Sequence, residues 1–263
     1  MDLGLKGKLA LVSGSTAGIG YAIVEALVKE GARVVVNGRT AESVDAAVAK
    51  LNGIAADSAL PFTADLSTPD AAARVARQFP DVEIVVANLG IFEPRAFEEI
   101  SDEEWLRYFN VNVLSGIRLA RLYLPSMRRN NWGRIIFISS ESAIQIPAEM
   151  IHYGMTKTAQ LAVSRGLAEA VAGTGITVNS VLPGPTRSRG VGDFVDALAK
   201  ADGKTFDEFE KEFFAKVRPT SLIKRFASPD EVASLVVYIA SPLASATTGA
   251  ALRVDGGVIK SAF

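Results

Sequence analysis

Short apolar runs rich in β-branched residues alternate with segments of helical periodicity along the whole chain. Such runs predict buried strands, and the segments in which apolar residues recur three and four positions apart predict amphipathic helices. The predicted strands are 8–13, 33–36, 60–63, 83–87, 134–140, 176–182 and 250–254. The predicted helices are 21–30, 41–51, 69–79, 102–127, 151–171 and 229–240. The alternation of strand and helix indicates an α/β fold with a parallel sheet.

The composition limits the kinds of protein that the chain can be. Its 263 residues, 49% of them hydrophobic, can bury the core of one α/β domain spanning 1–263. The net charge of -1 offers no basic surface for nucleic acid or for an acidic membrane. Cysteine is absent and His152 is the single histidine, so we expect no disulfide and no metal site. The first residues lack a leader pattern and no apolar run approaches the length of a membrane span, which predicts a cytoplasmic protein.

A glycine-rich turn follows the first predicted strand. Gly14, Gly18 and Gly20 stand between that strand and the next helix, and a second strand completes a βαβ unit. Glycines allow a tight turn and let backbone N–H groups approach a pyrophosphate, while the helix N-terminus contributes the positive end of its dipole. The strand, the turn and the helix together favour nucleotide binding, which the glycines alone would not.

A tyrosine and a lysine, Tyr153 and Lys157, stand four residues apart in the predicted helix 151–171. Residues with this spacing share one helix face, so the Lys157 ammonium can approach the Tyr153 phenol and lower its pKa toward the working range of an acid or base. Such pairs also occur by chance on amphipathic helices, so companions are needed. Ser139 and Ser140 supply them, because they end a predicted buried strand, where open α/β sheets bind ligands.

The order and spacing of these motifs resemble those of the classical short-chain dehydrogenase/reductase family over essentially the whole chain. The glycine spacing G-x-x-x-G-x-G is similar to the family's, with Ser13 where the family has threonine. Asn88 and Gly90 match part of the family's Asn-Asn-Ala-Gly turn, from which Ala87 and Leu89 depart. The resemblance implies a Rossmann-type, doubly wound, mostly parallel seven-stranded sheet with helices on both faces.

The resemblance also implies a role for each candidate catalytic residue. Ser140, which stands at the family's spacing from Tyr153 and is chosen over Ser139, would orient and polarise a substrate carbonyl. Tyr153 would donate the proton as hydride passes from the nicotinamide C4 to that carbonyl. Lys157 would lower the pKa of Tyr153 and bind the nicotinamide ribose. Asn112 would hold, through its backbone carbonyl, a water that contacts Lys157.

The second predicted strand is followed by Asn37 and Arg39, where a dinucleotide-binding fold meets the adenosine ribose. An acidic residue there would accept hydrogen bonds from the ribose hydroxyls of NAD and repel a 2′-phosphate, but this chain has none. The Arg39 guanidinium suits a phosphate, so we expect NADP(H) in preference to NAD(H). Alternatively, Arg39 is a solvated residue before the helix N-cap at Thr40.

Further cofactor contacts are expected by resemblance. Asp65 would touch the adenine amino group, with an ordinary loop carboxylate as the alternative. The full set of predicted cofactor residues is Gly14, Ser15, Thr16, Gly18, Ile19, Gly20, Asn37, Arg39, Asp65, Leu66, Asn88, Gly90, Tyr153, Lys157, Pro183, Gly184, Thr186 and Ser188. His152 lies beside Tyr153 rather than four positions away, so we expect it to line the substrate pocket or to lie on the helix surface, with catalysis by this histidine as the alternative.

The segment 189–225 would cover the active site as a substrate lid and decide which substrate is bound. Apolar residues at helical spacing predict two short amphipathic helices within it. These residues are Phe194, Val195, Leu198, Phe206, Phe209, Phe213 and Phe214. Some of them should pack onto the body, and the others should make the pocket wall apolar, which favours a carbonyl compound with a hydrophobic portion.

The predicted function is an NADP(H)-dependent carbonyl reductase or alcohol dehydrogenase acting on a ketone or secondary alcohol. A 3-oxoacyl thioester reductase and a sugar or polyol dehydrogenase are alternatives within this class. A non-catalytic dinucleotide-sensing protein is the alternative from another class, although a sensor has no need of a phenol tuned by an ammonium. By resemblance we expect a homotetramer or homodimer, in which the last strand and the helices around Asn112 and Tyr153 contact a partner.

Overall fold

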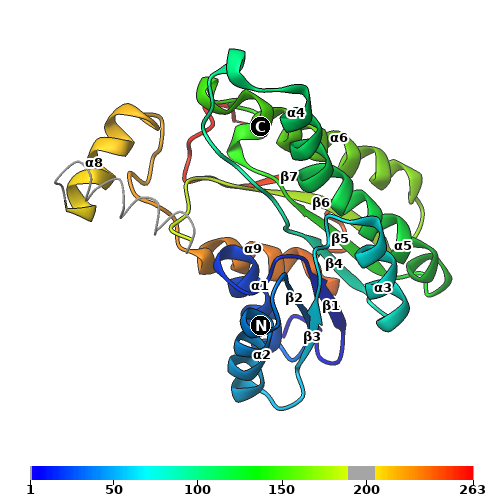
Figure 1. Ribbon diagram of the computed structural model, residues 1–263. Helices are drawn as coiled ribbons and strands as arrows, with labels where there is room; N and C mark the ends of the chain where they lie inside the picture. The colour runs from blue at the N-terminus through cyan, green and yellow to red at the C-terminus, as the bar shows by residue number, and fades with distance from the viewer. Residues whose placement is uncertain (1, 189–204, 263) are drawn as a thin grey trace.

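One parallel sheet of seven strands forms the centre of the molecule, in the order β3-β2-β1-β4-β5-β6-β7 (Figure 1). The computed structural model describes residues 2–188 and 205–262. The strands are β1 (Leu9–Val12), β2 (Arg33–Gly38), β3 (Ala59–Thr63), β4 (Ile84–Ala87), β5 (Gly133–Ile138), β6 (Ile176–Pro183) and β7 (Ala251–Val254). Every strand pairing is parallel, so the doubly wound fold is confirmed and the sheet, expected to be mostly parallel, is parallel throughout its described strands. The strand order reverses between β1 and β4, the switch point at which such sheets bind ligands.

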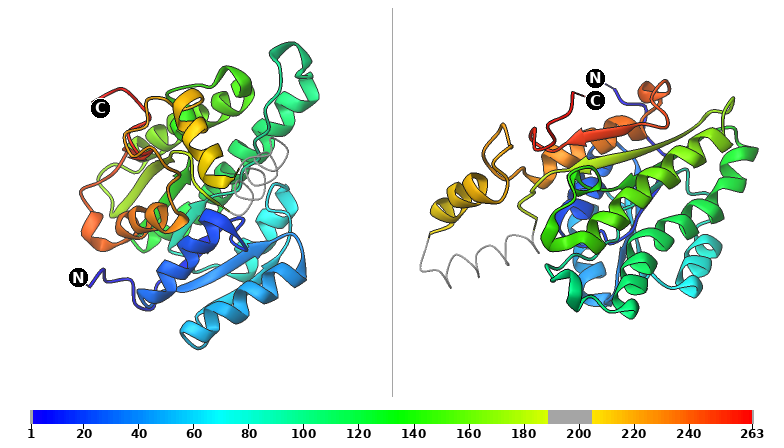
Figure 2. Two further views of the ribbon diagram at one scale, coloured as in Figure 1. Left: turned by 90° about the vertical axis from the view of Figure 1, so that its left-hand side faces the viewer. Right: turned by 90° about the horizontal axis from the view of Figure 1, so that it is seen from above.

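Helices cover both faces of the sheet, as Figure 1 and Figure 2 show. They are α1 (Gly18–Lys29), α2 (Ala41–Ile54), α3 (Pro69–Gln78), α4 (Asp102–Tyr108), α5 (Ser115–Arg129), α6 (Ile151–Ala170), α8 (Phe206–Lys216) and α9 (Pro229–Ala240). Side chains of β1 alternate between the faces: Ala10 and Val12 join the core under α1, α2 and α9, and Leu11 joins the core under α3, α5 and α6. In the part of the chain that the structure describes, no helix has the length and apolar character needed to cross a membrane.

The helix N-termini differ in how they are capped. The side chains of Thr40, Thr68 and Ser228 accept hydrogen bonds from backbone N–H groups in the first turns of α2, α3 and α9. Ala17, the N-cap of α1, contributes no side-chain hydrogen bond, and the first turn of α1 carries no acidic residue. The first N–H groups of α1 therefore remain available to an anion at the end of β1.

The helix expected over 102–127 is divided, and the prediction of one continuous helix is wrong. A π-helical segment, Phe109–Leu114, lies between α4 and α5. The Asn110 amide donates to the Leu106 carbonyl at 2.9 Å on the exposed side, whereas Asn112 is buried. Asparagine is unfavourable inside a regular α-helix, because its side chain competes for backbone hydrogen bonds. The wider π-helical turn accommodates both asparagines, since it points their side chains in directions that an α-helix would not allow.

Part of the predicted substrate lid is described. Phe194, Val195 and Leu198 lie outside the described residues. The remaining phenylalanines belong to α8, which is one of the two amphipathic helices expected. Phe206, Phe209, Phe213 and Phe214 pack with Phe226 in an apolar cluster separate from the two sheet cores. Some of these side chains were expected to pack onto the body and the others to line the substrate pocket. The described ones pack with one another in a small core of their own.

Candidate active site

The glycine-rich turn is hydrogen-bonded to the end of β2. Gly14 N–H donates to Asn37 Oδ1 at 3.0 Å, and Asn37 N–H donates to Ser15 Oγ at 2.9 Å. The Asn37 amide also donates to the backbone carbonyls of Phe62 and Ala64, at 3.1 and 3.0 Å. Ser15 and Asn37, both predicted cofactor residues, use their side chains to shape the turn. A bound cofactor can therefore contact Ser15 and Asn37 mainly through their backbone atoms.

The end of β4 supports the same turn from the other side. Ser13 Oγ accepts hydrogen bonds from the backbone N–H groups of Asn88 and Leu89, each at 3.0 Å. Asn88 Nδ2 donates to the carbonyls of Ser13 and Gly14 at 2.9 and 3.1 Å. A Cβ atom on Gly20 would lie 2.3 Å from the Gly14 carbonyl oxygen and 2.6 Å from Asn88 Nδ2. Only glycine fits at position 20, because the turn folds tightly onto the first turn of α1.

The turn and the N-terminus of α1 fit a nucleotide phosphate. Beside them, between α1 and α2, lies a hollow of about 270 Å³. It is lined by Thr16, Ala17, Gly18, Tyr21, Ser43, Ala46, Ala47 and Lys50. Hydroxyl groups and an amine are present in this lining without a carboxylate, a donor set that suits a phosphate. Arg39 is exposed and directly follows Gly38, which packs so closely on Thr16 that an added Cβ would lie 2.6 Å from its Cγ2.

Three other predicted cofactor residues lie after β3 and β4. Asp65 is exposed, and its Oδ1 accepts a hydrogen bond from Ser67 N–H at 2.9 Å. Leu66 is fully buried in the core, so it can contact a cofactor only through its backbone. Gly90 lies beside Lys157: an added Cβ would be 3.5 Å from Lys157 Nζ.

The turn after β6 holds the last predicted cofactor residues. Pro183 ends the strand, and a Cβ on Gly184 would lie 2.5 Å from the Asp255 carbonyl oxygen, so packing against that backbone explains the glycine. The Thr186 hydroxyl donates to the Gly184 carbonyl at 2.9 Å and is buried. Ser188 is half-buried beside it. Thr186 therefore stabilises the turn, and of these two hydroxyls Ser188 is the less enclosed.

Tyr153 and Lys157 lie together on α6. Lys157 Nζ is 5.5 Å from the centre of the Tyr153 ring and donates to the Ile138 carbonyl at 2.9 Å. Ser140 hydrogen-bonds Tyr153 through its side chain, whereas the Ser139 hydroxyl donates to the Lys157 carbonyl at 2.9 Å. Ser140 thus lies at the Tyr153 phenol, whereas the Ser139 hydroxyl contacts the backbone of α6 and not the phenol.

Burial determines the proton affinity of both groups. It raises the pKa of Tyr153 to about 12, and the hydrogen bond from Ser140 opposes this only in part. It lowers the pKa of Lys157 to about 7. The predicted lowering of the Tyr153 pKa by Lys157 is therefore wrong, because the loss of solvation outweighs the attraction and a buried lysine that loses its charge near neutral pH exerts a weaker field. At neutral pH the phenol keeps its proton, which is the form that a proton donor needs.

Asn112 is connected to Lys157 through Gln160. Asn112 Nδ2 donates to the Ile91 carbonyl and to Thr156 Oγ1, both at 3.0 Å. The Asn112 backbone carbonyl accepts a hydrogen bond from Gln160 Nε2 at 2.6 Å, and Gln160 Oε1 lies 3.4 Å from Lys157 Nζ. The Gln160 side-chain amide thus connects the Asn112 carbonyl to Lys157. Sequence reasoning missed Gln160, although its position three residues after Lys157 on one helix face was a usable signal.

His152 lies inside an aromatic group. Its side chain is fully buried, with ring centres 4.1 Å from Tyr108 and 6.0 Å from Trp105. The expectation that it lies on the helix surface is wrong, because α4 covers this side of α6. Burial lowers the pKa of His152, and neither imidazole nitrogen has a hydrogen-bond partner among the described residues. These surroundings suit packing better than proton transfer.

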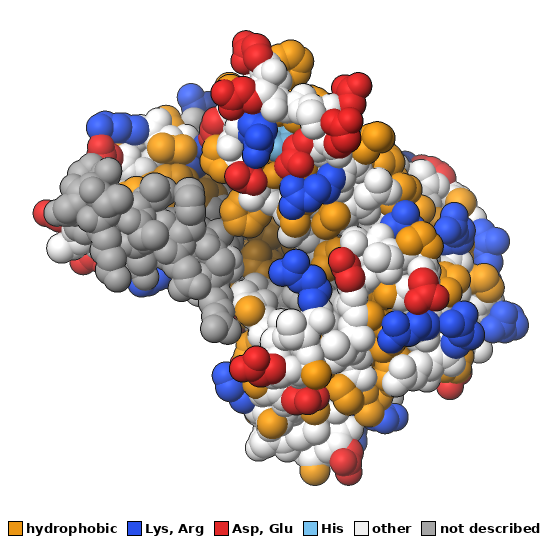
Figure 3. Space-filling model, viewed as in Figure 1, with side chains coloured by type: hydrophobic (Ala, Val, Ile, Leu, Met, Phe, Trp, Pro, Cys, Tyr) orange, Lys and Arg blue, Asp and Glu red, His pale blue; other side chains and the backbone are white. Residues whose placement is uncertain are grey.

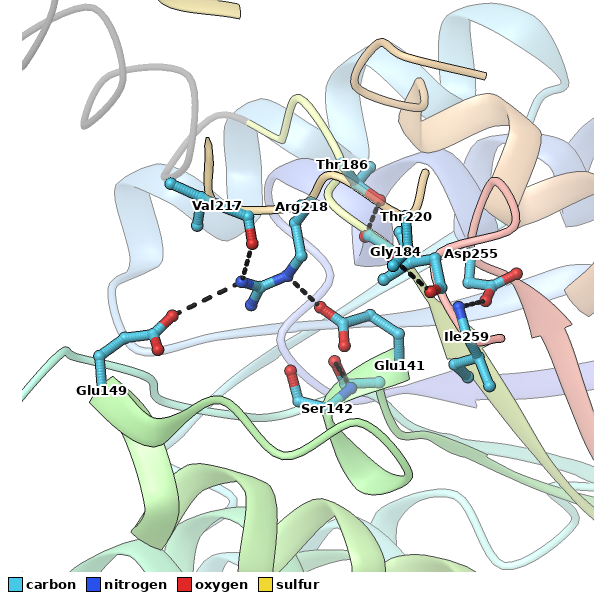
Figure 4. Close-up of polar contacts among 12 residues, drawn as sticks. Glu141, Ser142, Glu149, Gly184, Thr186, Val217, Arg218, Thr220, Asp255 and Ile259 are labelled. Atoms are coloured by element: carbon cyan, nitrogen blue, oxygen red, sulfur yellow. Dashed lines mark hydrogen bonds and ion pairs between the residues drawn. The ribbon is translucent and has the colours of Figure 1, made fainter. Parts of the chain in front are cut away.

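Two charged residues that sequence reasoning missed lie next to the site. Arg218 Nε donates to Glu141 Oε1 at 2.9 Å, and Arg218 Nη1 lies 3.5 Å from Glu149 Oε1 (Figure 4). Glu141 directly follows Ser140 in the chain. No local pattern signals the pair, because 77 residues separate Arg218 from Glu141.

The parallel sheet, the glycine turn and the group around Tyr153 define a dinucleotide-dependent oxidoreductase. A family model described as Enoyl-(Acyl carrier protein) reductase matches residues 14–259. The chain belongs to the classical short-chain dehydrogenase/reductase family, whose members act on CH–OH and C=O groups.

Relatives match the chain from end to end. The uncharacterized oxidoreductase YvaG of Bacillus subtilis is 47% identical over 264 residues, which cover 100% of both chains. The D-beta-hydroxybutyrate dehydrogenase of Rhizobium meliloti is 32% identical over 255 residues, 95% of this chain and 98% of its own. The crystal structure of L-sorbose reductase from Gluconobacter frateurii, complexed with NADPH and L-sorbose, has a TM-score of 0.93 and 32% identity, and covers 99% of this chain and 100% of that chain. These similarities indicate a nicotinamide cofactor for this chain.

Proposed function

We propose that the protein is an NADP(H)-dependent carbonyl reductase or alcohol dehydrogenase, which interconverts a ketone and a secondary alcohol. The observation that carries the proposal is the phenol of Tyr153, protonated at neutral pH, beside Ser140 and Lys157 at the carboxyl ends of the strands. A bound nicotinamide supplies or accepts the hydride. The NADPH complex of L-sorbose reductase supports this choice of cofactor.

In the proposed reduction, Tyr153 donates its proton to the carbonyl oxygen as negative charge develops there. The Ser140 hydroxyl donates a second hydrogen bond to the same oxygen. Lys157, with its pKa lowered to about 7, exchanges protons near neutral pH, and in this proposal it returns one to Tyr153. Ile138 and Gln160 hold the lysine in this position. In the oxidation, Tyr153 accepts the proton instead.

Apolar side chains border the proposed reaction centre. Phe92 is 49% exposed, and its ring meets Tyr153 edge to face with centres 6.1 Å apart. Ile146, also about half exposed, packs on Gly154 so closely that an added Cβ would lie 2.6 Å from its Cγ2. In Figure 3, hydrophobic side chains lie in and above the hollow in the middle of the face in view, and a Lys or Arg side chain lies below it. We therefore propose a carbonyl substrate that carries a hydrophobic portion.

Initial rates of NADPH oxidation with a panel of substrates test this proposal. The panel contains aliphatic and aryl ketones, keto sugars and 3-oxoacyl thioesters, because 3-oxoacyl-[acyl-carrier-protein] reductases are also among the relatives. We expect the highest kcat/KM with ketones that carry an apolar group. Tight NADPH binding without turnover on any member of the panel would contradict the proposal and support a dinucleotide-sensing protein.

Arg39→Ala is expected to lower kcat/KM for NADPH at least about tenfold while leaving kcat/KM for NADH within about twofold. The guanidinium is the cationic group that follows β2, and a 2′-phosphate is the part that NADPH has and NADH lacks. Steady-state kinetics with both cofactors and one ketone measures the change.

Arg33→Ala is the matched control, because Arg33 is exposed at the opposite end of β2 and should leave both values unchanged. An NADH preference in the wild type that survives Arg39→Ala would refute the assignment of the cofactor.

We also propose that the chain forms a homodimer or homotetramer through α5 and α6. An apolar groove of about 380 Å³ runs between these helices. It is lined by Ile117, Ala120, Arg121, Leu124, Pro125, Arg128, Val163 and Leu167. Exposed apolar surface of this kind suits contact with a second copy, as expected from the resemblance.

Val163→Lys is expected to dissociate the oligomer, because it would add a cation to an apolar groove that already contains Arg121 and Arg128. Sedimentation velocity measures the mass of each species. Ile54→Lys, at the exposed end of α2, is the control and should keep the wild-type mass. A monomeric wild type, or a Val163→Lys variant of unchanged mass, would contradict this interface.

A further inference from the structure

Arg218 connects the two ends of the loop that separates Ser140 from Tyr153. Glu141 follows Ser140 directly, and Glu149 precedes α6, on which Tyr153 lies. Arg218 Nε donates to Glu141 Oε1 at 2.9 Å, and its Nη1 lies 3.5 Å from Glu149 Oε1 (Figure 4). One guanidinium therefore bridges the residue after the serine and a residue just before the helix of the tyrosine.

The contact with Glu141 is the more enclosed of the two. The side chains of Arg218 and Glu141 are only 10% and 5% exposed, whereas that of Glu149 is 47% exposed. Burial raises the pKa of Glu141, and the Arg218 charge opposes this shift and favours the carboxylate. A buried ion pair is costly to separate, because each charge is left without water or partner. The Arg218 to Glu141 contact is thus a rigid connection, and Glu149 adds a weaker one at the surface.

The segment that carries Arg218 is bonded to α8 and to the loop 255–259. Its N–H donates to the Phe213 carbonyl at 3.0 Å, where α8 ends. Shortly after it, the Thr220 hydroxyl donates to the Val258 carbonyl at 2.5 Å (Figure 4). The loop 255–259 in turn packs on the turn after β6. Arg218 therefore joins the segment that follows α8 to both ends of the loop 141–149.

We propose that Arg218 is a positioning residue, which fixes the loop 141–149 so that Ser140 and Tyr153 keep the separation that proton donation requires. This inference rests on the proposed function. It assigns to Arg218 no contact with substrate or cofactor. Its effect reaches the reaction through Glu141 and the serine before it.

Arg218→Met is expected to lower kcat at least about tenfold while KM for NADPH changes less than about twofold, because misplaced reacting groups slow the chemical step without weakening cofactor binding. The glycine turn after β1 is formed by other residues and should be unaffected. Arg225→Met is the matched control: Arg225 lies in the same segment and pairs with Glu231 at the surface, where the two side chains are 49% and 43% exposed. We expect its kcat to stay within about twofold of the wild type.

The double variant Glu141→Gln with Arg218→Met separates positioning from charge balance. It removes both buried charges, so the thermal stability lost in Arg218→Met should return. If Arg218 only neutralised Glu141, kcat would return as well. A positioning role predicts that kcat stays low, since no side chain then connects the two ends of the loop 141–149. This variant also carries the test if Arg218→Met alone fails to fold.

The pH profile of kcat gives a further readout. The groups that face Tyr153 are Ser140, Glu141, Tyr108 and Arg218, together with Lys157 on its own helix. Removing Arg218 leaves the Glu141 carboxylate facing the phenol, so the alkaline limb should move to higher pH. Glu141→Gln should move it to lower pH.

A kcat within about twofold of the wild type in Arg218→Met, or its recovery in the double variant, would overturn the inference. The failure of the inference is distinguishable from the failure of the proposed function. If Tyr153→Phe also retains turnover, the proposed function is wrong. If Tyr153→Phe is inactive while Arg218→Met is active, only the role of Arg218 is wrong.

Discussion

Tyr153→Phe is expected to lower kcat at least about 100-fold while the dissociation constant for NADPH stays within about twofold of the wild type. The substitution removes one hydroxyl and keeps the ring, so the packing with Phe92 is retained. The proposed reaction loses its proton donor, because Ser140 alone is too weak an acid to replace a phenol. Initial rates with the best ketone give kcat, and quenching of protein fluorescence by NADPH gives the dissociation constant.

Tyr123→Phe is the matched control for this change. Tyr123 is buried in α5, and its hydroxyl has no hydrogen-bond partner among the described residues. Its loss should leave kcat unchanged and should not lower the melting temperature, because a buried hydroxyl without a partner is unfavourable. Turnover near the wild-type rate in Tyr153→Phe would refute the proposed mechanism.

Lys157→Met is expected to abolish most of the activity and to raise the melting temperature. The side chain is 4% exposed, and burial lowers its pKa from 10.5 to about 7. Placing an ammonium there costs the folded state on the order of a few kcal/mol at neutral pH. Methionine has a similar length and no charge, so it removes this cost, although it leaves the Ile138 carbonyl without its donor. Gain of stability with loss of activity is typical of a residue retained for chemistry.

The pH dependence of the stability gained in Lys157→Met follows from the lowered pKa of Lys157. Between about pH 7 and 10.5 the unfolded chain binds more protons at Lys157 than the folded chain, so wild-type stability rises with pH. Below pH 7 Lys157 is charged in the folded chain, and the cost of burying its ammonium is fully present. The stability advantage of Lys157→Met should therefore be largest in mildly acidic buffer and shrink toward pH 10.5.

Thermal unfolding at about pH 6.5 and pH 9.5, at one protein concentration, measures this difference. Lys29→Met is the control, because Lys29 is exposed at the end of α1 and should show no such trend. A methionine variant that is less stable than the wild type at the lower pH, or an advantage that grows with pH, would contradict the prediction.

The parts of the fold with local sequence signals could be predicted. The apolar runs mark the seven strands, and the glycine spacing marks the turn at the N-terminus of α1. Ser140, Tyr153 and Lys157 do lie together, because strand ends and helix faces have fixed geometry. Within the described residues, the π-helical turn that divides 102–127 was not predicted, because an added residue in one turn leaves the apolar pattern on either side intact.

The properties that depend on enclosure and on distant residues could not be predicted. The spacing of Tyr153 and Lys157 indicated proximity, but the direction of each pKa shift depends on how much water the folded chain excludes. Asn37 was placed at the cofactor by its position after a strand, and the structure shows its amide bonded to the turn and to two carbonyls. Arg218 pairs with Glu141 across 77 residues, a separation at which a single sequence carries no signal.

The π-helical segment Phe109–Leu114 acts as a phase shift between two helices that follow one another in the chain. Each residue of an α-helix advances the side-chain direction by about 100°, so one surplus residue rotates everything after it by that amount. α4 can therefore turn Tyr108 onto His152 while α5 independently turns Leu119 and Tyr123 toward the sheet. Deleting a single residue here would leave both helices intact and misdirect one of them. The length of this short stretch therefore sets the directions in which both helices point their side chains.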